Sequence, residues 1–251
     1  MTTEATVLLA TAIAVIAFVY GSVGLGGASS YVAVMALAGL DHREIPLVAL
    51  GLNLIVASAA LIQFARGEHL RTRMAVPLVA ASAPAAYLTA QIPLDRSTFQ
   101  LVLGALLVLA GARMVAAPWL RPRGGRREVR WPAFVGLGLL LGSAAGLTGI
   151  GGGVYLAPVL LLTGLASPKE AAAVCSVVVL ANSVAGIAGR IAAGGSMPWS
   201  LFLPLAGCVV VAGPMGAWVG ARRWRPEIVQ GVFGVLVLAV ALRLLAAGAT
   251  A

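Results

Sequence analysis

Long apolar runs, separated by short polar or glycine-rich connections, dominate the chain. They cover residues 7–20, 28–40, 45–65, 74–92 and 98–117, and then 131–148, 154–165, 171–193, 199–221 and 228–247. A helix needs ~20 apolar residues to cross a bilayer, so the longer runs predict transmembrane helices. Strands are disfavoured, because an open sheet cannot satisfy its backbone in lipid and no ten-residue alternation occurs. We therefore expect an all-α polytopic membrane protein.

The order of runs is the same in the two halves of the chain, which indicates an internal duplication. A shift of 125 positions matches two ordered sets of residues: Gly21, Gly24, Gly26, Gly27, Gly39 and Leu40 with Gly146, Gly149, Gly151, Gly152, Gly164 and Leu165. A shift of 130 matches Gln100, Gly104 and Arg113 with Gln230, Gly234 and Arg243. We predict a first transmembrane repeat over residues 1–117, a basic linker over 118–130 and a second repeat over 131–251.

Composition and charge support the membrane assignment and suggest an orientation. Of the 251 residues, 61% are hydrophobic and 10% charged, with a mean hydropathy of +1.01, whereas soluble domains average about 25% charged residues. The net charge of +9 comes from arginines and lysines in short connections, which is typical of topology determinants rather than of nucleic-acid binding. With the five arginines of 118–130 in the cytoplasm, 13 of the 17 basic residues lie inside if each glycine-rich break is a hairpin that enters and leaves on one side. The halves would then be inverted repeats in the inner (cytoplasmic) membrane, with both termini outside.

Each repeat would begin with a glycine-broken pair of short helices, followed by three transmembrane helices. The breaks are Gly24-Leu25-Gly26-Gly27 and Gly149-Ile150-Gly151-Gly152-Gly153. Irregular backbone within a bilayer is tolerated only where it is buried in protein or lines a cavity. Each break leads into a helix N-terminus, which favours anions. Inverted repeats would bring two such ends toward one site at mid-membrane. The alternative, in which these glycines only permit close helix packing, stays open.

The second break and the residues after it, Val154-Tyr155-Leu156-Ala157-Pro158, resemble the glycine-rich signature of the TauE/SafE sulfite exporter family, also called the toluene sulfonate uptake permease family. The two-half plan and the chain length are similar to that family as well. The first copy departs from the signature, since Ala28 replaces the third glycine and Ala33 stands where proline is expected. The resemblance implies transport of sulfite, thiosulfate or sulfonates, without indicating the direction.

Candidate substrate-binding residues follow from the breaks and from polar residues within the helices. All eight acidic residues fall at segment ends or in loops, which suits an anion and argues against a proton relay on a buried carboxylate. Asn53 and Asn182 occupy comparable positions, and their amides can donate to an oxyanion or bond a neighbouring helix. Arg190 is expected near the outer surface, where it either snorkels or attracts anions. The predicted substrate site comprises Gly24, Gly26, Gly27, Ala28, Ser29, Asn53, Gly149, Gly151, Gly152, Gly153, Val154, Tyr155 and Asn182.

These residues predict a secondary transporter that moves a small sulfur-containing anion by alternating access. The alternatives are an anion channel of the same architecture or, less favoured, a membrane-embedded enzyme. Rings of Arg or Lys at helix centres would favour a channel, and an enzyme would need a buried cluster of His, Cys or carboxylates. The sequence has neither feature. We expect no cofactor, metal site or nucleic-acid partner. The partners would be the anion and the lipid bilayer, and a homo-oligomer stays open.

Overall fold

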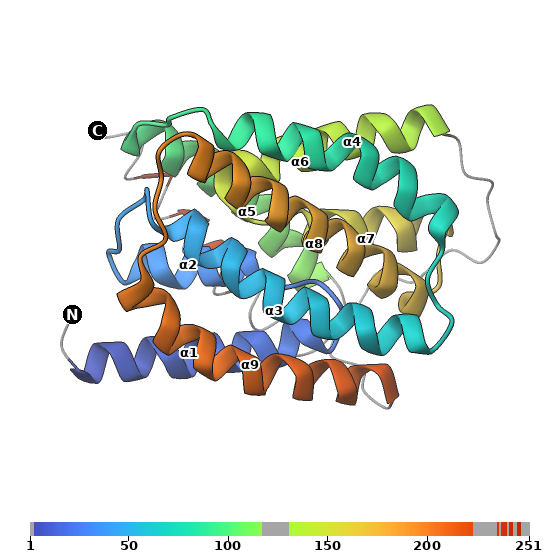
Figure 1. Ribbon diagram of the computed structural model, residues 1–251, viewed down its shortest axis with the longest axis horizontal. Coiled ribbons are helices and arrows are strands. Elements are labelled where there is room, and N and C mark those ends of the chain that lie inside the picture. Colours follow the sequence, from blue (N-terminus) through green and yellow to red (C-terminus); the bar gives the residue numbers. More distant parts are fainter. Residues whose placement is uncertain are drawn as a thin grey trace.

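The computed structural model describes residues 3–116 and 131–222, together with residues 235, 237–239, 241–242 and 245–246. Every regular element in these residues is a helix, as the sequence predicts (Figure 1). The predicted linker 118–130 and most of the predicted helix 228–247 lie outside the described residues. The helices are α1 (Thr3–Gly21), α2 (Ala28–Leu37), α3 (Ile45–Arg66), α4 (Thr72–Ala90), α5 (Arg96–Ala116), α6 (Trp131–Thr148), α7 (Gly153–Leu162), α8 (Pro168–Ala192) and α9 (Trp199–Arg222).

The described surface has the character of a membrane protein. Four of the described helices, α3, α6, α8 and α9, are long and apolar enough to cross a bilayer, and shorter apolar helices accompany them. Large apolar side chains face outward, among them Leu8 at 74% exposure, Leu140 at 68% and Trp218 at 48%. Such exposure is costly in water but natural against lipid. The chain is therefore a multi-pass membrane protein.

The two short helices, α2 and α7, end in the same way. Gly39 and Gly164 follow them with positive φ of 76° and 70°. The amides of Leu40 and Leu165 then reach back to the carbonyls of Met35 and Leu160, at 3.2 and 3.0 Å. This is the Schellman arrangement, in which a left-handed residue, usually glycine, ends the helix. The glycine pair matched by the 125-residue shift thus has one local role in both halves.

Helices from the two halves are interleaved. The helix α1 packs along α9, and α6 packs along α4, while α3 and α8 lie against each other at the centre. Glycines permit the close approach: a Cβ at Gly216 would overlap the carbonyl of Phe18, and one at Gly142 would overlap that of Ser82. If α1 corresponds to α6 and α4 to α9, the two pairs are equivalent. Figure 1 shows α1 and α6 beginning at opposite ends of the molecule. The inverted relation of the complete halves stays a prediction.

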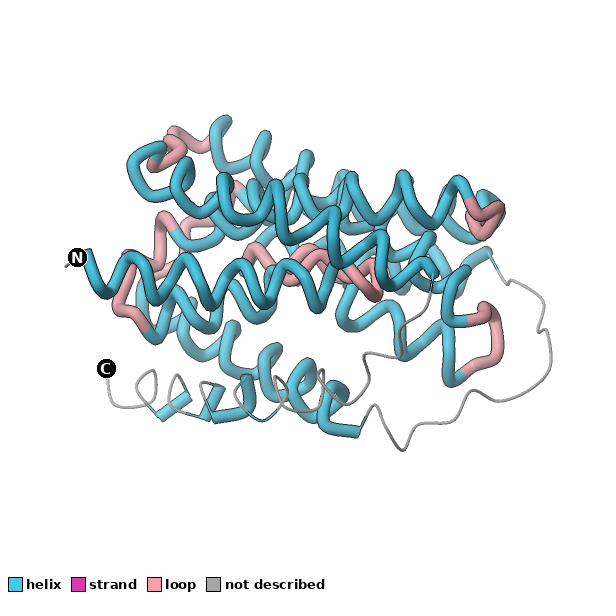
Figure 2. Tube along the Cα trace, turned by 90° about the horizontal axis from the view of Figure 1, so that it is seen from below, coloured by secondary structure: helices cyan, strands magenta, loops and turns pink. Residues whose placement is uncertain are grey.

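The loops gather at two ends of the bundle. Residues 42–43, 91–94, 193 and 195 line one cavity, so the loops that follow α2, α4 and α8 share one end. At the other end, the loop before α4 meets the start of α8, where Arg71 pairs with Glu170. These two ends are called the first end and the second end below. The glycine breaks lie between them, within the helical body (Figure 2).

Candidate functional site

The two breaks have nearly the same backbone conformation. Gly26 and Gly27 have φ of 84° and 99°, and Gly151 and Gly152 have φ of 79° and 87°. In both breaks the last of these glycines is the N-cap of the short helix, in the left-handed region. Residues with a Cβ reach that region only with strain, so the glycines are needed for the turn itself. The free amides of the first turns of α2 and α7 are therefore set at the ends of two similar turns.

Asn53 of α3 lies between the breaks. A Cβ at Gly26 would stand 2.7 Å from its Oδ1, and one at Gly151 would stand 2.5 Å from its Nδ2. Val179 of α8 touches the same region, since a Cβ at Gly153 would lie 2.5 Å from its Cγ2 and 3.2 Å from the carbonyl oxygen of Leu25. The structure thus brings both breaks together between the central helices α3 and α8.

Asn53 and Asn182, both fully buried, bond to the backbone of the breaks. Oδ1 of Asn53 accepts a hydrogen bond from the amide of Ala28, the first residue of α2, at 3.1 Å. Nδ2 of Asn182 donates to the carbonyl of Gly151 at 3.3 Å. The remaining amide atoms, Nδ2 of Asn53 and Oδ1 of Asn182, have no hydrogen-bond partner among the described residues. A buried polar group without a partner is costly, so each of these two atoms could accept a hydrogen-bonding partner such as a ligand or an ordered water.

Other predicted residues lie in packing contacts around this junction. The carbonyl of Gly24 accepts from Oγ of Ser176 at 3.2 Å, and a Cβ at Gly149 would meet Pro46 at 2.6 Å. Ser29 lies 3.3 Å from the Tyr20 hydroxyl. The hydroxyl of Tyr155 donates to the carbonyl of Leu106 at 2.8 Å. Of the predicted site, the residues gathered at the junction are Gly26, Ala28, Asn53, Gly151, Gly152, Gly153 and Asn182; Gly24, Ser29, Gly149 and Tyr155 support it, Gly27 lies beneath the Tyr31 ring, and Val154 is buried in the core.

The sequence did not single out Val179, and it placed Arg190 only approximately. Val179 precedes Asn182 by three residues, so the two share a helix face; that spacing was the available signal. Arg190 turns inward rather than toward water: its guanidinium donates to the carbonyls of Gly146 and Leu147, at 2.7 and 2.9 Å. It thereby caps the end of α6, directly before the second break.

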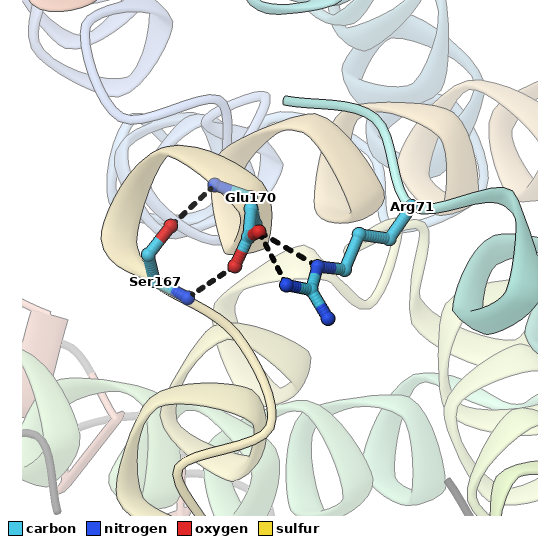
Figure 3. A network of polar contacts seen from close by, with 3 residues as sticks. All are labelled: Arg71, Ser167 and Glu170. Atoms are coloured by element: carbon cyan, nitrogen blue, oxygen red, sulfur yellow. Dashed lines mark hydrogen bonds and ion pairs between the residues drawn. The ribbon is translucent and has the colours of Figure 1, made fainter. Parts of the chain in front are cut away.

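The ion pairs of the described residues lie away from the junction, unlike the charge of Arg190. The Arg71–Glu170 ion pair, at 2.7 Å, is at the second end (Figure 3). Glu170 also accepts from the Ser167 amide at 2.8 Å and forms a capping box with that residue. This cluster anchors the start of α8 and is structural. Among the described residues, no three His, Cys, Asp or Glu side chains gather as metal ligands.

Comparisons with known proteins agree with this architecture. The family model described as "Sulfite exporter TauE/SafE" matches residues 8–244. The chain is also 34% identical, over 98% of its length and 100% of the relative, to "Probable membrane transporter protein y4hK" of Sinorhizobium fredii. The family match covers nearly the whole chain, including both glycine breaks and all nine helices described above, apart from the first residues of α1. The protein is thus a membrane transporter that belongs to the TauE/SafE sulfite exporter family.

Proposed function

We propose that this protein is a secondary transporter that carries a small sulfur-containing anion, namely sulfite, thiosulfate or an organosulfonate, across the cytoplasmic membrane. The observation that carries the proposal is the position of Asn53: one amide group contacts both glycine breaks, and its Nδ2 has no partner among the described residues. The family description names sulfite export, which supports the substrate class. No catalytic group is required, so we propose transport without an enzymatic step.

The electrostatics of the junction favour an anion. The N-terminus of each short helix carries roughly half a positive charge, and the protein interior screens this charge poorly. The acidic residues Asp41, Glu44, Glu68, Asp95 and Glu170 lie in loops or at helix starts. An oxyanion at the junction would therefore meet amide donors without a nearby carboxylate. Main-chain amides also release a ligand more readily than a buried arginine clamp would, because their interaction is weaker.

The two asparagines would have different roles. Asn53 has an unused donor, Nδ2, which can bond directly to an oxyanion. Asn182 has already used its donor on Gly151, and its unused Oδ1 is an acceptor, which a fully ionised oxyanion would avoid. We therefore propose Asn53 as a substrate ligand. Asn182 would be a positioning residue that fixes the carbonyl of Gly151, so that the neighbouring amides face the anion.

Alternating access would require the breaks to separate. Asn53 and Val179 fit so closely against Gly26, Gly151 and Gly153 that a Cβ at any of these glycines would overlap them. This packing supports a closed arrangement of the site. The equivalent pairs α1–α9 and α6–α4 support a movement of one pair relative to the other about α3 and α8. Inverted repeats, with both termini outside, would relate the two opened states by a pseudo-two-fold rotation about an axis in the membrane plane.

Uptake into proteoliposomes tests this proposal. Purified protein is reconstituted and exposed to equal concentrations of labelled sulfite, thiosulfate, sulfate or taurine, with empty liposomes as the control. We expect saturable uptake of at least one of the sulfur anions, and no uptake of a matched cation. Unsaturable flux that rises linearly with concentration would indicate a channel instead. Absence of flux for every anion, with intact insertion, would contradict the proposal.

A further inference from the structure

A cavity of about 400 Å³ opens at the first end, apart from the glycine junction. Its lining includes His42 and Arg43 from the loop after α2, Gln91 from the end of α4, and Arg190 and Ala193 from the end of α8. No carboxylate belongs to its described lining. Asp41 lies on the same loop but lines a smaller neighbouring cavity, where its carboxylate is 3.1 Å from Nδ1 of His42. We call the larger space the entrance cavity.

Arg190 connects the entrance cavity to the second break. It lines the cavity and caps the carbonyls of Gly146 and Leu147, and Leu147 also lines the cavity. Gly149, where the break begins, follows two residues later. The Nε of Arg190 is buried and finds no hydrogen-bond partner within the described chain. A guanidinium has five N–H donors, so the α6 carbonyls leave donors for another acceptor.

The entrance cavity lies nearer the first end than Asn53 does, along the same helix α3. Leu47 lines the cavity, and Asn53 follows it by six residues, which is about 9 Å along a helix at ~1.5 Å per residue. Between them, Leu50 is fully buried, with Cδ1 2.9 Å from where a Cβ on Gly186 of α8 would stand. The cavity and the junction are thus consecutive positions along one helix, separated by an apolar contact between α3 and α8.

We propose that the entrance cavity is a second anion site, occupied before the substrate reaches the glycine junction. The ligand class is a small oxyanion of four or five heavy atoms, which fits with several waters, since one water takes about 30 Å³. Arg190 holds the anion through donors that the α6 carbonyls do not use, and Arg43 adds positive charge at the rim. The identity of the ligand as a transported substrate rests on the proposed function; the anion site itself rests on the cavity.

Thiol labelling at Ala193 tests this site directly. Ala193 is exposed and lines the cavity, so Ala193→Cys, in a Cys208→Ser parent, places a reporter there in the full-length protein. The labelling rates of a negatively and a positively charged thiosulfonate reagent are divided by their rates with a free thiol. We expect the normalised rate of the negative reagent to exceed that of the positive reagent. Arg190→Gln should reduce the ratio of these two rates on the order of fivefold, because it removes one unit charge about 7 Å away in water. The control is Arg73→Gln, the same charge change at an exposed position at the second end.

Thiosulfate protection then separates this proposal from the proposed function. We expect thiosulfate to slow the labelling of Ala193→Cys. The protection should be weaker when Arg190→Gln or the loop variant Arg43→Gln is added to Ala193→Cys. It should be undiminished when Asn53→Ala is added instead. Arg43 is exposed, so its variant remains informative if loss of the α6 cap prevents Arg190→Gln from folding. Protection that disappears in Asn53→Ala would overturn the entrance site while leaving the junction intact. The entrance site would also be overturned if Ala193→Cys showed no charge preference beyond that of a free thiol. The same holds if thiosulfate gave no protection in the otherwise unchanged Ala193→Cys protein. Protection that persists when no anion is transported would support the entrance site and contradict the proposed function.

Discussion

The first and second glycine breaks have nearly the same backbone course, yet asparagine fastens them in opposite chemical senses. At the first break, Oδ1 of Asn53 accepts from the amide of Ala28. At the second, Nδ2 of Asn182 donates to the carbonyl of Gly151. Asn53 is left with a donor and Asn182 with an acceptor, neither of which has a partner in the described parts of the chain. Two residues that the predicted duplication would make equivalent thus offer different free atoms, and only the donor of Asn53 suits an anion.

A second difference concerns the residue that begins each short helix. A Cβ at Gly153 would lie 2.5 Å from Cγ2 of Val179, so this position of α7 has no room for alanine. The corresponding Ala28 of α2 is buried without such a conflict and bonds to Asn53. The missing third glycine of the first break thus has a packing explanation. Val179 contacts the second break more closely than the first, which makes the second break the tighter of the two.

The largest effect is expected from Asn53→Asp. The substitution is nearly isosteric, but it replaces the free donor with an oxygen and adds a buried negative charge. Like charges about 4 Å apart repel by roughly 4 kcal/mol at an effective dielectric constant of 20, which corresponds to a loss of affinity on the order of a thousandfold. The measurement is initial uptake of thiosulfate against concentration. Uptake at the parental rate by a folded variant would show that the anion does not pass Asn53.

Leucine substitutions in the tighter break should also abolish transport. Gly151→Leu and Gly152→Leu place a residue with a Cβ in the left-handed backbone conformation, which costs about 1–3 kcal/mol of strain. The leucine side chain also blocks the approach of a ligand to the main chain. The matched control is Gly136→Leu on α6, because a Cβ at Gly136 meets nothing within 4 Å among the described atoms. We expect normal insertion for all three and uptake only for Gly136→Leu. Parental uptake by both break variants would mean that the breaks are packing features.

A smaller effect is expected from Asn182→Ala. It leaves the Gly151 carbonyl buried without its partner, which costs about 1–3 kcal/mol of stability. Since Asn182 is proposed to position the break rather than to bind, KM for thiosulfate should rise by about tenfold or less. Asn53→Ala, measured in parallel, should raise KM more. The reverse order of the two KM values would exchange the roles assigned to the asparagines.

The smallest effect concerns the start of α8 at the second end, which has a capping box, whereas α3, the corresponding long helix of the first half, begins without a side-chain cap. Ser167→Ala should lower the stability of the protein by about 1 kcal/mol without changing KM, because Ser167 only caps α8. Ser196→Ala, at an exposed loop position, is the control in the same thermal unfolding assay. A change in KM would give the second end a part in substrate binding.

The hydrophobic pattern was sufficient to predict the nine described helices α1–α9 and the glycine turns between α1 and α2 and between α6 and α7, because lipid imposes long apolar runs and glycine permits the turns. It was less precise where capping extends a helix beyond its apolar run. The predicted run began at residue 171, whereas α8 begins at Pro168, since the capping box draws Lys169 and Glu170 into its first turn. The contacts of Val179 with Gly153 and of Arg190 with α6 were not predicted. Both join elements far apart in sequence, and no local pattern encodes such packing.

A structure with thiosulfate bound would show directly whether an anion occupies the junction between the breaks. We expect density between the two breaks, within hydrogen-bond reach of Nδ2 of Asn53 and of backbone amides in residues 24–29 and 149–155. Density at the entrance cavity in addition would be consistent with the second site. Density at the junction coordinated mainly by carbonyl oxygens would indicate a cation site instead of an anion site. An empty junction, with thiosulfate bound elsewhere in the membrane interior, would place the transport pathway away from Asn53.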